Sequence, residues 1–324
     1  MLYRWTCWVL LVFVCAVHSS LCGGSPPADF PDWLFPLDPS ASTPVTWDST
    51  QLLSNEHSKL HYTQAQLKDL FNAPDWFPES HDQMPEVVIH GRKPDVFACG
   101  FCHTPSGQGR PENASLAGLS ASYIARQLEE LRSGVRKQVG PVSYRPIGAM
   151  VALAAHLTDD QIRSAADYFS KQSLNHRVDI KESKNIPCVK PALWIYLKST
   201  ECKEEPLGAR IIEIAPSGER HELRDDSMVY IAYVPIGSVA RGRMLTHNSD
   251  SARACSTCHG ENLRGTDLAP PLAGRSPSSL LRQLVAFQMR TRAGERSVLM
   301  QPVVDKMDMR DMIAAVAYAA SLNP

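Results

Sequence analysis

The sequence lacks a charge excess of either sign. Its 324 residues carry 33 Lys and Arg against 34 Asp and Glu, which gives a formal net charge of −1. The chain therefore has neither the basic balance typical of nucleic-acid binding nor an acidic tail. Beyond its first residues it also has no apolar run long enough to cross a bilayer. We expect no nucleic-acid partner and no strong membrane anchor.

The start of the chain is typical of an export signal. Arg4 gives a short basic region, residues 5–17 are almost wholly apolar, and small residues follow. About 13 apolar residues are too few to span a bilayer comfortably. We therefore predict an exported protein that loses residues 1–24. Lipidation of Cys22 is the minor alternative, because Leu21 suits that processing poorly.

Cysteine is scarce outside this leader, and four of the six remaining cysteines form two short motifs. Both motifs read Cys-x-x-Cys-His, and they consist of Cys99, Cys102 and His103, and of Cys255, Cys258 and His259. In such a motif two thiols add across the vinyl groups of a haem, and the His supplies a nitrogen to the iron. One Cys-x-x-Cys also suits a zinc site or a redox dithiol. Two in an exported chain predict two covalently attached haem c groups.

The two motifs begin an internal repeat. At an offset of 156 positions, Leu116-Ala117-Gly118 falls on Leu272-Ala273-Gly274, and Arg126-Gln127-Leu128 falls on Arg282-Gln283-Leu284, with no insertion between. The C-terminal parts match at an offset of 150, because the first copy has a longer loop. Two unrelated motifs would not share this register. The register therefore predicts a duplicated domain.

The sequence predicts a mainly α protein with two tandem domains, a small β-containing insert between them and an irregular N-terminal extension. The boundaries that we predict are 1–24 for the signal peptide, 25–80 for the extension, 81–173 and 237–324 for the two haem domains, and 174–236 for the insert. Within the insert, residues 209–214 and 228–234 have strand patterns. The charged run 219–226 between them is expected to be a solvated face, and the aromatic residues of the extension to pack on a neighbouring apolar surface.

Helix-capping residues predict where other helices begin. Capping boxes at Thr63 and Thr158 and a cap at Asp308 begin three helices, and Ser122 is placed to cap another. An iron held by one His needs a sixth ligand, and a thioether marks an electron carrier. Met150 and Met300 are the expected iron ligands opposite His103 and His259. Each ends a loop, eight residues before Thr158 or Asp308. His156 is the alternative ligand for the first iron.

Other residues have supporting roles. The carbonyl twelve residues after each motif His, at Pro271 and Ser115, is placed to accept from its second ring N–H. Arg126 and Arg282 either meet haem propionates or are solvated. Cys188 and Cys202 are expected to form a disulfide across about 13 intervening residues; a thiolate ligand or a redox pair is the alternative.

The twofold order of Cys-x-x-Cys-His, Leu-Ala-Gly, Arg-Gln-Leu and a Met before a capped helix resembles the dihaem class I cytochromes c of the c4 type. The second half is most similar, through residues 255–260, 269–274 and 282–287. The first half departs from the family at Thr104, where the family usually has Gly, and at Ser115. The resemblance does not extend to the N-terminal extension or the insert.

The resemblance implies a periplasmic electron carrier with one haem c in each domain. Single electrons would pass from a donor, such as a dehydrogenase or a quinol-oxidising complex, to an acceptor such as a terminal oxidase. Two alternatives stay open: a cytochrome subunit of a periplasmic dehydrogenase complex, and a dihaem enzyme, either a peroxidase or a thiosulfate-oxidising protein, with one open or unusually ligated iron. A carrier is favoured over an enzyme. The sequence indicates no particular oligomeric state.

Overall fold

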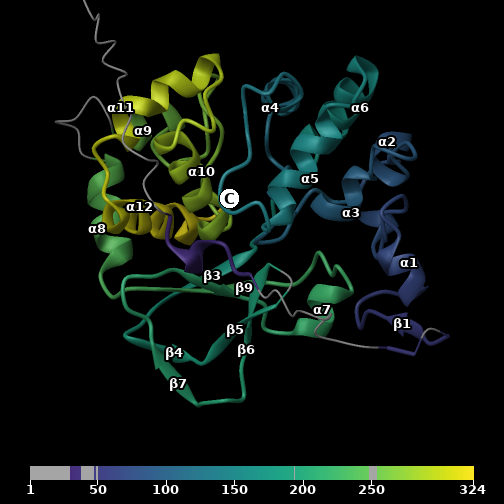
Figure 1. The fold of residues 1–324 in the computed structure, drawn as a ribbon, viewed down its shortest axis with the longest axis horizontal. Helices are drawn as coiled ribbons and strands as arrows, with labels where there is room; N and C mark the ends of the chain where they lie inside the picture. Colours follow the sequence, from purple (N-terminus) through teal and green to yellow (C-terminus); the bar gives the residue numbers. More distant parts are fainter. Residues whose placement is uncertain (1–29, 38–46, 49, 193, 248–253) are drawn as a thin grey trace, which may run out of the picture.

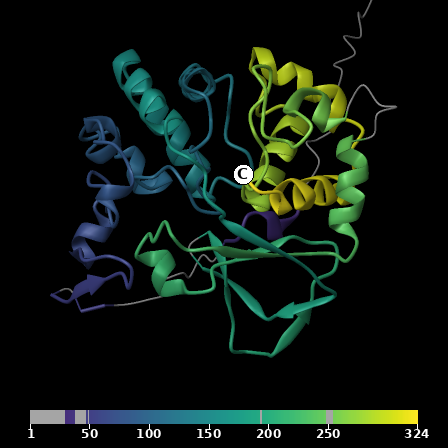
Figure 2. The same cartoon turned by 180° about the vertical axis from the view of Figure 1, so that it is seen from behind.

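The computed structural model describes residues 30–37, 47–48, 50–192, 194–247 and 254–324. The expected signal peptide and Cys22 lie outside the described residues. Within the described ranges, no helix is both long and apolar enough to cross a membrane. Two groups of helices stand side by side on a sheet that lies below both of them (Figures 1 and 2).

The first helical group follows the extension. Its helices are α2 (Glu86–Ile89), α3 (Cys99–His103), α4 (Ala121–Arg132), α5 (Arg145–Ala154) and α6 (Asp159–Ser170). Helix α4 packs against α5 and α6 around a core that contains Ile124, Leu153 and Phe169. The capping box at Thr158 begins α6 as predicted.

The second helical group ends the chain. Its elements are α8 (Ser238–His247), α9 (Cys255–His259), α10 (Pro277–Gln288), the 3₁₀ helix η3 (Glu295–Met300), α11 (Gln301–Val304) and α12 (Met309–Ser321). The residue bounds of α3 and α4, moved by 156 positions, are those of α9 and α10. Asp308 caps α12 as predicted, through an acceptor oxygen 2.7 Å from the backbone nitrogen of Asp311.

The region between the two groups is richer in strands than predicted. Its elements are β3 (Val178–Glu182), β4 (Asn185–Pro187), β5 (Val189–Ala192), β6 (Ile195–Lys198), β7 (Glu204–Pro206), β8 (Ile212–Ile214), α7 (Gly218–Glu222) and β9 (Tyr230–Val234). Five strands form one mixed sheet in the order β3-β9-β8-β6-β5, and β4 pairs with β7. The predicted disulfide between Cys188 and Cys202 is present and ties the β4–β5 junction to the start of β7.

The extension packs on the rest of the molecule. Its elements are the 3₁₀ helices η1 (Asp32–Leu34) and η2 (Pro78–Ser80), the hairpin β1 (Leu52–Ser54) and β2 (His61–Thr63), and α1 (Gln64–Lys68). Phe35 is buried in a core cluster shared with Tyr144 of the first half, Ile211 of the insert and Leu281 of α10. Trp76 donates from its indole nitrogen to the Leu223 carbonyl, 2.6 Å away. The prediction that these aromatics cover an apolar surface is confirmed.

Two buried side chains join the insert and the extension to the second helical group. Glu213 of β8 accepts from the Ser276 hydroxyl at 2.7 Å and also from the hydroxyl of Ser278, at the start of α10. A carboxylate at a helix N-terminus satisfies free N–H groups and complements the helix dipole. Arg282, on α10, donates to the carbonyls of Leu34 in the extension and Pro111 in the first half.

Three local predictions are wrong. Ser120, not Ser122, caps α4, and its hydroxyl accepts from the Tyr123 backbone at 3.3 Å. Met150 lies inside α5 rather than at the end of a loop, because Pro146 in the first turn begins that helix earlier. The charged run 219–226 is not a solvated face, since it contains α7 and the buried residues His221 and Asp225.

Replacing Glu213 with Ala is expected to destabilise the protein by about 1–3 kcal/mol, since the Ser276 hydroxyl and the buried hydroxyl and backbone N–H of Ser278 lose their acceptor. Thermal and urea unfolding of the holoprotein measure the loss. Glu204→Ala, at an exposed position of β7, is the control and is expected to change stability little. Equal stability of the two variants would show that Glu213 does not anchor the sheet to α10.

Candidate functional site

The two Cys-x-x-Cys-His motifs form short helices with the same surroundings for the His. Nδ1 of His103 lies 2.7 Å from the Ala114 carbonyl, and Nδ1 of His259 lies 2.7 Å from the Pro270 carbonyl. The predicted acceptors, Ser115 and Pro271, are therefore wrong by one residue. The cause is the tight turn after each motif, which brings the eleventh carbonyl and not the twelfth to the ring. With Nδ1 engaged, Nε2 is the nitrogen left to bind a metal.

Burial disfavours the charged forms of both imidazoles and of the first cysteine of each motif. It lowers the pKa of His103 and His259, although the backbone carbonyl acceptor acts in the opposite direction. It raises the pKa of Cys99 to about 12 and that of Cys255 to about 11. Reactive and redox thiols have lowered pKa values, so the environment of these two does not suit a redox dithiol.

Both motifs line one cavity of about 390 Å³ that extends between the two helical groups. Its walls are mostly apolar, and they include Leu131 and Phe169 from the first half and Leu284 and Val316 from the second. An apolar cavity with a few placed polar groups is the usual form of a cofactor site. The structure therefore brings together the four cysteines and two histidines that the sequence singled out.

Met150 and Met300 also line this cavity, each in its own half. Met307 lines it too, at the position that matches Leu157 in the offset of 150. His156 does not line the cavity; its side chain is 52% exposed, with Nδ1 4.0 Å from an Asp95 oxygen. The thioethers of Met150 and Met300 are thus placed to approach a bound group, whereas the imidazole of His156 is not.

A polar contact that the sequence reading missed lies between the two halves of the cavity. Arg136 donates to the side-chain oxygens of Gln127 and Gln283 at 2.9 and 3.0 Å, and Arg292 donates to the same two oxygens at 2.9 and 3.0 Å. The two arginines lie 156 residues apart, as do the two glutamines. We call these four residues the Arg–Gln ring. Their identical spacing was the signal in the sequence that could have found them.

The ring carries more positive charge than its protein neighbours balance. Burial and the charge of Arg292 lower the pKa of Arg136 to about 10. One carboxylate, that of Glu130, is bonded to the Arg–Gln ring. It accepts from the side-chain amide of Gln127 at 2.8 Å. The buried Nε of Arg292 lacks a protein acceptor among the described residues. Two buried guanidinium groups beside one carboxylate favour an anionic ligand in the cavity.

Arg126 and Arg282, predicted either to meet propionates or to be solvated, lie in different surroundings. Arg126 lines the cavity, and its buried Nε has no hydrogen-bond partner among the described residues, so its place agrees with the prediction. Arg282 points elsewhere, because its guanidinium binds the two backbone carbonyls that hold the extension and the first half. Arg275 lines the cavity instead and donates to the carbonyls of Ser115 and Ala117, both at 2.8 Å.

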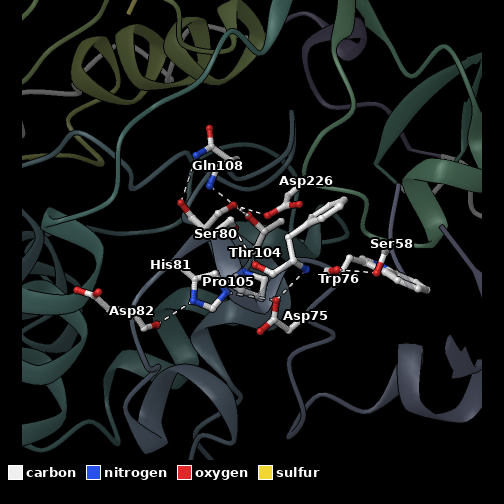
Figure 3. A network of polar contacts seen from close by, with 12 residues as sticks. Ser58, Asp75, Trp76, Ser80, His81, Asp82, Thr104, Pro105, Gln108 and Asp226 are labelled. Atoms are coloured by element: carbon white, nitrogen blue, oxygen red, sulfur yellow. Dashed lines mark hydrogen bonds and ion pairs between the residues drawn. The ribbon is translucent and has the colours of Figure 1, made fainter. Parts of the chain in front are cut away.

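The insert and the extension add a polar cluster behind the first motif. Figure 3 shows Asp75 of the extension and His81, the first residue after it, beside the turn Thr104–Gln108 that follows α3, with Asp226 of the insert on its other side. Nε2 of His81 lies 3.2 Å from an Asp75 oxygen, and the Ser106 hydroxyl donates to Asp226. Nearby, Glu112 lies 3.2 Å from Arg110 and 3.4 Å from His221. The charged run 219–226 thus packs against the first half.

The residues present fit a haem c in each half. The paired thiols suit its vinyl groups, the free His Nε2 and the thioether suit the two sides of its iron, and the apolar walls suit its ring. The under-neutralised guanidinium groups of Arg136 and Arg292 suit its two carboxylates. Two such half-sites around one cavity suit a chain that carries more than one haem c, as in the multihaem c-type cytochromes.

Known proteins similar to the chain point to one family of these. No protein-family model matches the chain. Cytochrome c4 from Azotobacter vinelandii is 23% identical over 230 residues, which cover 69% of this chain and 84% of that protein. A thiosulfate dehydrogenase electron acceptor from Thiomonas intermedia is 27% identical over 231 residues, covering 70% of this chain and 80% of that protein.

Two solved structures are also similar to the chain, each with a TM-score below 0.5. The thiosulfate dehydrogenase of Marichromatium purpuratum has a TM-score of 0.45 at 29% identity; the match covers 70% of this chain and only 37% of that one. Cytochrome c4 of Acidithiobacillus ferrooxidans also has a TM-score of 0.45, at 20% identity. The sequence relatives, two of them cytochromes c4 matched over more than four fifths of their length, support a c4-type dihaem electron-transfer cytochrome with covalently bound haem c.

The ionisation of the buried Glu112 predicts how the stability of the folded protein changes as the pH falls. Burial raises the pKa of its carboxyl, but Arg110 and His221 outweigh burial and lower it to about 2, below its usual 4.5. A lowered folded-state pKa stabilises the protein above pH 4.5, and this stabilisation is lost as the pH falls through about 2. Glu112→Gln is expected to remove on the order of 3 kcal/mol at pH 7 and to flatten the loss of stability below pH 4.5.

Urea unfolding of the holoprotein between pH 7 and pH 2.5 measures this dependence. Glu129→Gln, at an exposed position of α4, is the matched control and is expected to follow the wild type. A Glu112→Gln variant with the acid dependence of the wild type would contradict the assignment.

Proposed function

We propose that the protein is a periplasmic electron carrier with two haem groups, each held by two thioether bonds and by one His and one Met ligand. The observation that supports this most directly is the shared cavity: one apolar space is lined by both Cys-x-x-Cys-His helices and by Met150 and Met300. Haem c, when bound, supplies an iron that takes up and releases one electron.

Each side chain has a separate task in this proposal. Cys99 and Cys102 hold the first haem, and Cys255 and Cys258 hold the second. His103 and His259 present Nε2 to the irons, and their Nδ1 contacts with backbone carbonyls fix the ring orientation. The thioethers of Met150 and Met300 fill the sixth positions, favour the reduced state and leave no position open for a substrate.

The Arg–Gln ring favours electron exchange between the two groups. It holds the halves together at the boundary between the two haem sites, and its guanidinium groups would pair with the carboxylates of both haems. A rigid contact keeps the distance between the haems constant, so an electron that enters one half can pass to the other. Arg136 and Arg292 therefore position the haems rather than take part in any chemical step.

A free carrier is favoured over a dedicated dehydrogenase subunit. The extension and the insert, which could have served as docking arms, pack onto the molecule's own halves through Phe35 and Glu213, and onto each other through Trp76. The relative named a thiosulfate dehydrogenase electron acceptor supports a periplasmic dehydrogenase as one source of electrons. A terminal oxidase is the proposed destination.

The ligand assignment predicts the response of the reduced holoprotein to carbon monoxide, measured by absorption spectroscopy. The wild type is expected to keep its spectrum, since both sixth positions are occupied. Met150→Ala and Met300→Ala are each expected to let half of the haem bind carbon monoxide, and the double variant all of it.

Met307→Ala and His156→Ala are the controls, since one side chain lines the cavity without ligating and the other lies outside it. Both are expected to behave as the wild type. Carbon monoxide binding to half of the wild-type haem would overturn the carrier and favour an enzyme with one open iron. Loss of a ligand in Met307→Ala would move the second assignment from Met300 to Met307.

A further inference from the structure

The two attachment helices repeat in sequence but not in their surroundings. Phe101, in the middle of α3, is 5% exposed, whereas Thr257, its counterpart in α9, is exposed. In the loops that follow, the buried Glu112 corresponds to Leu268, which is 48% exposed. The outer face of the first helix is therefore covered, and that of the second is open to solvent.

Arg224 of the insert makes the central contact of this cover. It follows α7, in a left-handed backbone conformation with φ of 58°. Its guanidinium carbon lies 3.6 Å from the centroid of the Phe101 ring, and Nη1 donates to the Phe101 carbonyl at 3.0 Å. Nε donates to the Leu67 carbonyl of α1 at 3.2 Å. The side chain is thereby fixed against the helix that carries Cys99, Cys102 and His103.

The charge of Arg224 is not neutralised locally. No described carboxylate lies within 4.0 Å of its guanidinium, whereas Arg110 beside it is paired with Glu112. Phe101, whose ring and carbonyl hold the guanidinium, lies directly before Cys102 in α3. The Cys102 sulfur, one of the proposed haem attachment points, therefore lies within the field of this cation.

We propose that Arg224 sets the reduction potential of the first haem above the value that the same site would have without this charge, and that it leaves the second haem unaffected. The inference rests on the proposed function. A fixed cation in a low-dielectric environment disfavours the ferric state, which carries one more positive charge than the ferrous state. Among the described residues, no side chain of the insert is hydrogen-bonded to α9, whereas Arg224 is bonded to α3.

The proposed step is the transfer of a single electron. One electron passes to the first haem from the second, or from a redox partner protein, and no bond or proton changes place. With its potential raised by Arg224, the first haem holds that electron more strongly than it would without this charge. The insert thus gives two half-sites of similar sequence different electrostatic environments.

Spectroelectrochemical titration of the holoprotein tests the proposal. Arg224→Met keeps the bulk and removes the charge. It is expected to lower the ratio of ferrous to ferric first haem about tenfold at a fixed applied potential, which is 59 mV for one electron. Arg224→Lys keeps the charge and is expected to retain most of the wild-type potential. The titration step that changes in Met150→Ala identifies the first haem.

Arg220→Met is the matched control, because Arg220 lies on the same insert but is paired with Asp225 at 2.6 Å. It is expected to leave both steps near their wild-type values. Unchanged potentials in Arg224→Met, equal shifts of both haems, or a shift in Arg224→Lys as large as that in Arg224→Met would overturn the role of the charge. A wild-type preparation with fewer than two attached haems per chain would instead overturn the proposed function itself.

Discussion

The contact on which the arrangement of the two sites depends is the Arg–Gln ring. Arg136 and Arg292 each donate to both Gln127 and Gln283, so neither half can move without breaking hydrogen bonds to buried charged groups. Residue pairs at one repeat spacing meet across a local pseudo-twofold axis, which is how a duplicated unit makes a self-complementary interface. The same contact brings positive charge to the boundary between the haem sites.

The insert and the extension act against this symmetry. Glu213 and Arg282 fasten them to α10, Arg224 fastens the insert to α3, and Trp76 joins the extension to the insert. The first attachment helix thereby acquires a cation in contact with its outer face. Equal motifs in unequal electrostatic environments are the physical basis for two electron-transfer sites with different properties.

The sequence alone predicted what depends on local pattern. The attachment motifs, the disulfide and the caps at Thr63, Thr158 and Asp308 are short-range features, and the fold class follows from the repeat. Features that depend on tertiary packing were not predicted from the sequence. The run 219–226 is charged, so solvent was the natural expectation, and its burial depends on partners such as Arg110 and Ser106 more than 100 residues away. Strands such as β5, which contains Lys and Pro, have no strong sequence pattern.

Mass spectrometry of the exported, mature protein, intact and after proteolysis, tests the central claim most directly. The account predicts an intact mass that exceeds that of the polypeptide by two haem groups, with one haem on the peptide that contains Cys99 and Cys102 and one on the peptide that contains Cys255 and Cys258. A chain with free thiols, with zinc in place of haem, or with haem on only one motif would contradict it.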